Sequence, residues 1–146
     1  LCRGYWRRAG ATAERFYPDG MFRTGDTGRK DADGRVTIVG RSKDLIISGG
    51  FNVYPAEVEM QLAEVPGVLD IAVIGVPHPD FGEAVVAVVT VDRSVFVLDA
   101  LESAAKENLA RFKQPKAIHV VDEFPRNAMG KILKNDLRAQ YQHEFA

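Results

Sequence analysis

Apolar residues follow two different spacings along the chain from about residue 44 onward. Residues 68–76 and 84–91 are nearly continuous apolar runs rich in valine, which is typical of buried strands, and residues 116–121 predict a third strand. Apolar residues at helical spacing mark three helices: Val58, Leu62 and Val65; Leu98, Leu101, Ala105, Leu109 and Phe112; Leu133, Leu137 and Tyr141. Pro66 is expected to end the first helix and Pro115 the second. The pattern predicts a compact α+β unit with a roughly three-stranded sheet and flanking helices.

The first 39 residues show a different pattern. They are rich in glycine, arginine and aromatic residues, with turn signals at residues 18–20 and 31–34. Short strands are predicted at residues 21–24 and 36–39. This part therefore reads as a meandering β piece too small to close a core of its own, and a domain boundary is expected within residues 41–44.

The boundary lies at the start of the sequence GRSKDLIISGGFNVYP, residues 40–55. A glycine pair, Gly49 and Gly50, interrupts a short β-branched run, and Pro55 and Glu57 favour a helix start. The simplest interpretation is a hairpin followed by a helix. Glycines also let another molecule approach the main chain closely, so the turn is a candidate contact site.

Composition limits the function classes. Of the 146 residues 46% are apolar and 27% charged, as in globular proteins, and the net charge of −1 gives no general attraction to nucleic acid or anionic lipid. The longest apolar run, residues 84–91, is far too short for a membrane span. The single cysteine, Cys2, cannot form an internal disulfide, which fits a reducing compartment. We expect a cytoplasmic protein without a nucleic-acid partner.

Three charged residues stand beside glycines. Asp26 follows Gly25 and a predicted strand, where a carboxylate can accept hydrogen bonds from a sugar diol or bond its own backbone in a turn. Arg41 can reach the same nucleotide or pair with a neighbouring acid. Lys131 follows Gly130 on a loop, where a cation can stabilise charge building on a phosphoryl or carboxylate oxygen, or can simply be solvated.

A second candidate site lies at the end of the second predicted helix. Phe112 and Lys116 offer an aromatic face and a cation that can hold a nucleotide by stacking and charge; alternatively, this segment only terminates the helix. His78 and Asp80 are two potential metal ligands without a third partner, and we interpret them as turn residues. No metal site is predicted.

Several short motifs occur in a fixed order: Gly4-Tyr5-Trp6, Thr24-Gly25-Asp26, Gly40-Arg41-Ser42-Lys43-Asp44 with Ser48-Gly49-Gly50, and Pro125-Arg126 with Gly130-Lys131. In this order they resemble the C-terminal part of the adenylate-forming superfamily, which includes acyl-CoA synthetases, firefly luciferase and peptide-synthetase adenylation domains. The resemblance covers essentially the whole chain. Residues 75–83 and 125–131 look most like malonyl-CoA synthetases and related small-acid CoA ligases.

The resemblance implies an ATP-dependent, AMP-forming ligase. A small carboxylic acid such as malonate would react with ATP, with magnesium, to give an acyl-adenylate and pyrophosphate, and coenzyme A would then displace AMP. Residues 1–42 would be the end of a large N-terminal domain, and residues 43–146 a mobile C-terminal domain that serves both steps by rotation. The ATP phosphate loop, acyl pocket and magnesium site would lie in the preceding part of the N-terminal domain, so the chain alone is expected to be inactive.

The resemblance also implies residue roles. Asp26 would bind the ribose hydroxyls and Arg41 the nucleotide beside them, and Lys43 would be the hinge. Lys131 would stabilise charge in the first step, and its acetylation by a lysine acetyltransferase would switch the enzyme off. The remaining roles concern coenzyme A: Gly49 and Gly50 would line the pantetheine tunnel, and Phe112 and Lys116 would meet the nucleotide end.

Two other interpretations stay open at this point. One is a peptide-synthetase adenylation domain that passes its acyl group to a carrier domain. The other is a non-catalytic α+β interaction module in which the glycines and lysines are only structural.

Overall fold

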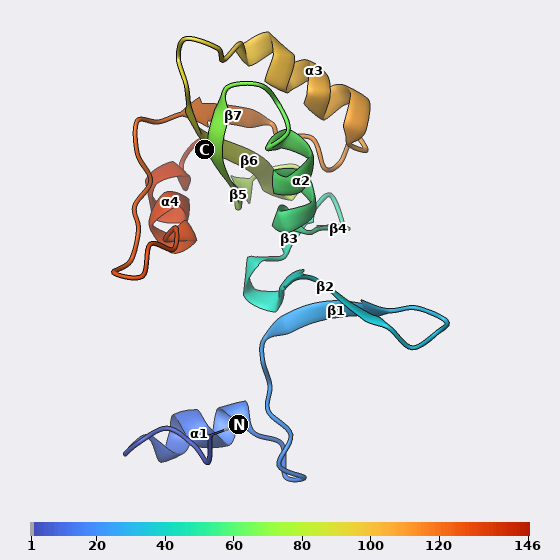
Figure 1. Cartoon of the computed structure of the whole chain (residues 1–146), viewed down its shortest axis with the longest axis vertical. Helices are drawn as coiled ribbons and strands as arrows, with labels where there is room; N and C mark the ends of the chain where they lie inside the picture. Colours follow the sequence, from blue (N-terminus) through green and yellow to red (C-terminus); the bar gives the residue numbers. More distant parts are fainter. Residues whose placement is uncertain (1) are drawn as a thin grey trace. The chain divides into compact units, whose positions relative to one another are not determined.

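The computed structural model describes residues 2–146, and the chain forms two compact units (Figure 1), one ending at Lys43 and the other comprising Asp44–Ala146. The first unit contains one helix, α1 (Ala9–Arg15), and an antiparallel hairpin of β1 (Asp26–Lys30) and β2 (Val36–Arg41). A short 3₁₀ turn, η1 (Ser42–Asp44), follows. No helix within residues 2–146 combines the length and the apolar character needed to cross a membrane.

Two expectations for the first unit were wrong. Residues 21–24 do not form a strand, since Phe22 makes only an isolated bridge with Phe16. The strand begins at Asp26 instead, and its sequence, DTGRK, is too polar to show as an apolar run. Helix α1 was not predicted because it buries none of its residues, so it carries no apolar stripe.

The second unit is built on a five-stranded sheet rather than the three strands predicted. The strands are β3 (Ile46–Ser48), β4 (Phe51–Val53), β5 (Val68–His78), β6 (Gly82–Val91) and β7 (Ala117–Val120). The order is β4-β3-β6-β5, and β7 runs parallel to β6 while the other pairs are antiparallel. The two additional strands are three residues each, which is too short to stand out as strands by periodicity.

Both faces of this sheet are buried, which explains the continuous apolar runs. Along β5, Val73 lies in one core cluster and its neighbours Ala72 and Ile74 in the other. Helices α2 (Pro55–Leu62) and α3 (Leu98–Asn108) cover the first face through buried Leu62 and Leu101, and α4 (Lys134–Tyr141) covers the second through Leu137 (Figure 1). The α+β prediction is confirmed.

The second predicted helix ends earlier than its apolar stripe. Helix α3 ends at Asn108, and Leu109 is extended, yet Leu109 and Phe112 still pack on the core. The side-chain amide of Gln114 donates hydrogen bonds to the carbonyl oxygens of Leu109 (2.9 Å) and Lys106 (3.5 Å). Because these carbonyls lack partners in the last turn, Gln114 satisfies the end of the helix and turns the chain toward β7.

Glu59 joins three elements of the second unit. Its Oε1 accepts a hydrogen bond from the Val73 N–H of β5 (2.7 Å) and pairs with the Lys134 ammonium at the start of α4 (2.6 Å). We expect Glu59→Ala to lower the free energy of unfolding by about 1–3 kcal/mol, because both partners lose their acceptor in a half-buried site. Denaturant unfolding checks this, and Glu59→Gln should cost less because it retains the oxygen that accepts from Val73. Equal losses in the two variants would contradict this role.

Candidate functional site

The glycine pair forms the tip of the β3–β4 hairpin. Ser48 pairs with Phe51 across the turn, and Gly49 and Gly50 both have positive φ (57° and 82°). A two-residue hairpin loop with positive φ at both positions is the type I′ turn that glycine favours, so the sequence itself explains this shape. The Gly49 N–H donates to the carbonyl oxygen of Phe81 (2.9 Å), which ties the turn to the start of β6, and both glycines are exposed.

A pocket of about 430 Å³ opens beside this turn. It is lined by Ser48, Gly49, Phe51, Phe81, Arg111, Phe112 and Lys116. The Phe51 and Phe112 rings stack with centroids 4.6 Å apart, and the Lys116 ammonium lies 5.6 Å from the Phe81 ring centroid. The structure thus brings three predicted residues, Gly49, Phe112 and Lys116, to one aromatic pocket with two cations at its wall.

The loop that carries Phe112 is anchored by an ion pair. Lys113 pairs with Glu57 in the first turn of α2 (2.5 Å), and Lys113 is mostly buried. This ion pair holds the segment after α3 against α2, which leaves the Phe112 ring against Phe51. The pocket wall is therefore preformed rather than loose.

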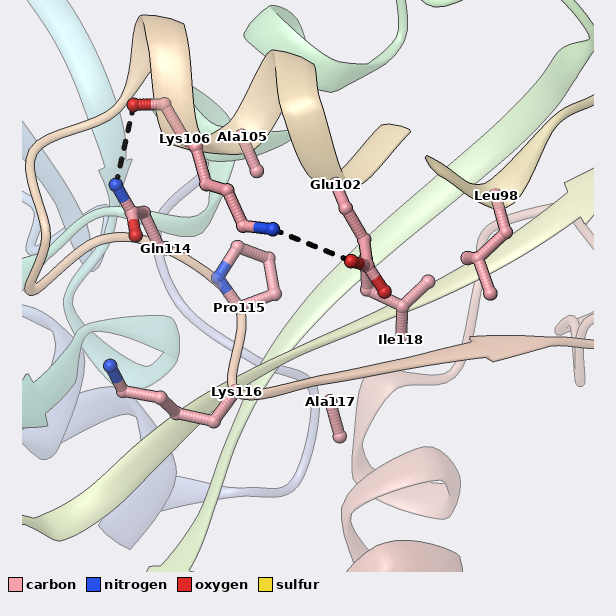
Figure 2. A pocket seen from close by; sticks show the side chains of 9 residues that line it. All are labelled: Leu98, Glu102, Ala105, Lys106, Gln114, Pro115, Lys116, Ala117 and Ile118. Atoms are coloured by element: carbon pink, nitrogen blue, oxygen red, sulfur yellow. Dashed lines mark hydrogen bonds and ion pairs between the residues drawn. The ribbon is translucent and has the colours of Figure 1, made fainter. Parts of the chain in front are cut away.

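A second pocket, of about 260 Å³, lies between α3 and β7 (Figure 2). Figure 2 shows the Lys106 ammonium directed at the Glu102 carboxylate, 3.5 Å away, and Gln114 bonded to the Lys106 carbonyl. Lys116 lines both pockets, but the polar groups of this one are largely used within α3 and its end. The aromatic pocket beside the glycine turn is the better candidate for a ligand.

Lys131 lies on the loop between β7 and α4, and its side chain is exposed. The loop closes as a tight hairpin, in which Arg126 bridges to Ile132 and the N–H of Asn127 donates to the Lys131 carbonyl (2.9 Å). None of the hydrogen bonds or ion pairs found among residues 2–146 uses the Lys131 ammonium. Within residues 2–146 the loop therefore presents an unpaired cation on a well-defined turn.

Asp26 and Arg41 lie opposite each other at the base of the β1–β2 hairpin. The Arg41 Nε is 3.0 Å from Asp26 Oδ1, and the Asp26 side chain keeps 27% of its surface exposed. The Asp26 N–H donates a hydrogen bond to the Thr24 hydroxyl oxygen (3.0 Å). Asp26 and Arg41 thus form one ion pair, and part of each side chain stays accessible.

Lys43 is exposed and lies at the junction between the two units. The next residue, Asp44, pairs with Arg138 of α4 (2.9 Å), and both side chains are at least three-quarters buried. The second unit is thus anchored from its first residue, Asp44. Lys43 is the residue immediately before this anchor.

His78 and Asp80 bond to each other in the proline-rich turn. His78 Nδ1 accepts a hydrogen bond from the Asp80 N–H (3.1 Å), and the His78 ring contacts Phe81 and Phe145. Among residues 2–146 no group of three or more histidine, cysteine, aspartate or glutamate side chains is placed to hold a metal ion.

Sequence reasoning missed four residues of these sites. Phe51, Phe81 and Arg111 line the aromatic pocket, and no spacing rule places them there because they come from three separate parts of the chain: the start of β4, the turn before β6 and the segment after α3. Asn127, which holds the Lys131 loop, did carry a signal, since asparagine followed three residues later by glycine is typical of a type I turn.

Comparison with known protein families shows which family the chain belongs to. Residues 57–131, about half of the chain, match the model of the family described as AMP-binding enzyme C-terminal domain. The chain belongs to this family. Of the candidate residues, Phe112, Lys116 and Lys131 lie within the segment that matches the AMP-binding enzyme C-terminal domain, and the glycine turn lies shortly before it.

Relatives of this AMP-binding enzyme C-terminal domain extend the similarity over nearly the whole chain. The chain is 45% identical to the long-chain-fatty-acid–CoA ligase FadD13 of Mycobacterium tuberculosis and 46% identical to a feruloyl-CoA synthase of an Amycolatopsis species. Each match covers 97% of the chain but only 28% or 29% of the relative. The crystal structure of ATP-bound MatB from Rhodopseudomonas palustris matches 99% of the chain with 48% identity and a TM-score of 0.89, and 29% of that protein is covered. The chain thus spans less than a third of the length of these relatives.

Proposed function

We propose that the chain is the C-terminal part of an ATP-dependent acyl-CoA synthetase that forms an acyl-adenylate and then a CoA thioester. In the first half-reaction a carboxylate oxygen attacks the α-phosphorus of ATP, and the bond to pyrophosphate breaks. In the second the sulfur of coenzyme A attacks the acyl carbonyl, and AMP leaves. Residues 1–42 would end the large adenylation domain, and residues 43–146 would be the mobile C-terminal domain.

The observation that carries this proposal is the presence of two separate, exposed sites on one small unit. The Lys131 loop precedes α4, while the glycine turn joins β3 to β4, and Figure 1 shows these two places well apart. One site offers an exposed cation and the other a bare backbone beside an aromatic, cationic pocket. A domain that turned about Lys43 would present them in succession to the same reaction centre, since a few residues between rigid units can absorb large dihedral changes.

Each site suits one half-reaction chemically. We assign Lys131 to adenylation, where a preorganised cation stabilises charge passing between the carboxylate and the phosphate. Gly49 and Gly50 would line the path of the pantetheine arm, because a backbone without side chains leaves room for a slender chain. The nucleotide end of coenzyme A would occupy the aromatic pocket, with its base against Phe112 and its phosphates near Lys116.

The first unit would contribute to ATP binding. We propose that Asp26 accepts hydrogen bonds from the ribose hydroxyls and that Arg41, already paired with Asp26, contacts the nucleotide beside them. Magnesium would accompany the ATP phosphates and be held outside this chain. The paired geometry supports this assignment because Arg41 orients the Asp26 carboxylate while about a quarter of the Asp26 side chain stays accessible.

The acyl substrate is proposed to be malonate or another small carboxylic acid, following the resemblance of residues 75–83 and 125–131 to malonyl-CoA synthetases. The relatives with similar identity have names that specify substrates as different as long-chain fatty acids, ferulate and sulfoacetate. That all of these names denote CoA ligases or synthases favours coenzyme A over a carrier domain as the acceptor. We also propose a cytoplasmic location and control by acetylation of Lys131, which would remove its charge.

Pyrophosphate exchange by the full-length protein, measured across a panel of carboxylic acids, tests the proposed function. Exchange that depends on a small dicarboxylic acid, followed by CoA-dependent release of AMP, is the expected result. Absence of exchange with every acid would overturn the ligase proposal. Exchange without transfer to coenzyme A would instead support an adenylation domain that serves another acceptor.

The pocket yields a separate prediction for coenzyme A. We expect Lys116→Ala or Arg111→Ala to raise the KM for coenzyme A about tenfold, since one charge-assisted contact contributes about 1.5 kcal/mol. Pyrophosphate exchange should stay unchanged in both variants. Lys106→Ala is the matched control, because Lys106 is a lysine of the neighbouring pocket that already pairs with Glu102. An unaltered KM in both pocket variants would contradict the assignment.

A further inference from the structure

The turn that carries Lys131 is organised by the side chain of one residue, Asn127. Its Oδ1 accepts hydrogen bonds from the N–H of Met129 (3.0 Å) and from the N–H of Lys131 itself (2.9 Å). The main chain of Asn127 repeats this pattern, because its carbonyl accepts from Gly130 N–H and its N–H donates to the Lys131 carbonyl, both at 2.9 Å. Both main-chain polar groups of Lys131 are therefore bound to Asn127.

The rest of the loop anchors this turn to the sheet. The Arg126 guanidinium donates to the Gly130 carbonyl (2.8 Å) and pairs with Asp70 of β5. Gly130 has a φ of +79°, the left-handed conformation that closes such a turn without strain in glycine. The backbone on both sides of Lys131 is thus fixed, although the lysine side chain itself extends free into solvent.

We infer that Asn127 is a positioning residue for Lys131: its amide oxygen holds the lysine backbone, so that the side chain extends from one fixed point toward the reacting phosphate. This rests on the proposed adenylation role of Lys131. A cation contributes most to a reaction when its position is set before the substrate arrives, and a displacement of about 1 Å can cost about a hundredfold in rate. An exposed loop lysine without such a turn would sample many positions.

A purely structural role and a positioning role predict different behaviour for variants of Asn127. The turn is exposed at Asn127, Ala128, Met129 and Gly130, so water can replace the lost acceptor and the fold should tolerate substitution. Asn127→Ala removes the oxygen that holds Lys131, while Asn127→Asp retains an oxygen that can accept the same two N–H groups. Met129→Ala is the matched control because Met129 is 77% exposed and contributes only its main chain to the turn.

The test uses the full-length protein and measures the two half-reactions separately. We expect Asn127→Ala to lower the kcat of pyrophosphate exchange about 10- to 100-fold with little change in the KM for ATP. Conversion of supplied acyl-adenylate to thioester should be unchanged, Asn127→Asp should recover most of the exchange rate, and Met129→Ala should match the wild type. Equal slowing of both half-reactions, or no recovery in Asn127→Asp, would overturn the inference.

A second measurement does not depend on activity. Hydrogen exchange at the Lys131 amide should be faster in Asn127→Ala and return toward the wild-type rate in Asn127→Asp, and an unchanged rate would also overturn the inference. Lys131→Ala, assayed in parallel, separates the two proposals. If Lys131→Ala abolishes pyrophosphate exchange and Asn127→Ala does not slow it, the positioning role of Asn127 fails while the role of Lys131 stands. If neither variant affects pyrophosphate exchange, the role of Lys131 itself fails.

Discussion

Replacing Lys131 by alanine in the full-length protein is expected to slow adenylation about 100- to 1,000-fold, because removal of one preorganised charge contact costs about 2.7–4 kcal/mol of transition-state stabilisation. The structure supports a direct electrostatic role, since the ammonium is exposed and makes no ion pair or hydrogen bond among residues 2–146. The side chain can therefore be removed without leaving a partner unsatisfied, and the fold should be unaffected.

The decisive comparison for Lys131→Ala is between the two half-reactions. Pyrophosphate exchange reports adenylation, and release of AMP from supplied acyl-adenylate in the presence of coenzyme A reports thioester formation. We expect only the first to be slowed. Lys131→Arg retains the positive charge and should lose less than the alanine variant, although the larger guanidinium changes the reach. Similar slowing of both half-reactions would refute the assignment of this lysine to the first step.

The pattern of apolar residues predicts those parts of this fold that pack against a core. Strands β5 and β6 show as continuous runs because alternate residues face two cores, and α2, α3 and α4 show as stripes because each covers one of these cores. Elements with little burial leave no such trace. Helix α1 buries nothing, and β1 is a polar strand whose partner is β2, so neither could be found from hydrophobicity.

The candidate sites divide in the same way. Turn chemistry predicts the β3–β4 hairpin from the glycine pair, and the same reasoning could have found the Asn127–Gly130 turn. One pocket contains Gly49, Phe112 and Lys116 because of contacts between residues far apart in the sequence. The Gly49 N–H donates to the carbonyl oxygen of Phe81, and Lys113 pairs with Glu57. Such contacts follow from the packed fold, and local spacing contains no information about them.

The glycine turn gives the second large prediction, which concerns thioester formation. Gly50→Leu in the full-length protein is expected to slow conversion of acyl-adenylate to thioester about a hundredfold while pyrophosphate exchange continues. A Cβ added at Gly50 meets no atom within 4 Å, so a side chain here fits the folded chain and projects into the surrounding space. That space is where we place the pantetheine arm, and a branched side chain would obstruct it.

Backbone strain has to be separated from obstruction in Gly50→Leu, because Gly50 has a φ of +82° and a side chain in this conformation costs about 1–2 kcal/mol. Gly34→Leu is the matched control. Gly34 is exposed in the β1–β2 hairpin turn, with a φ of +85° and only ordinary contact for an added Cβ, so it carries similar strain outside the unit that carries the glycine turn. We expect Gly34→Leu to retain both half-reactions and Gly50→Ala to lie between the wild type and the leucine variant. If Gly50→Leu slowed adenylation as much as thioester formation, the turn would have a structural role only, and coenzyme A would have to approach by another route.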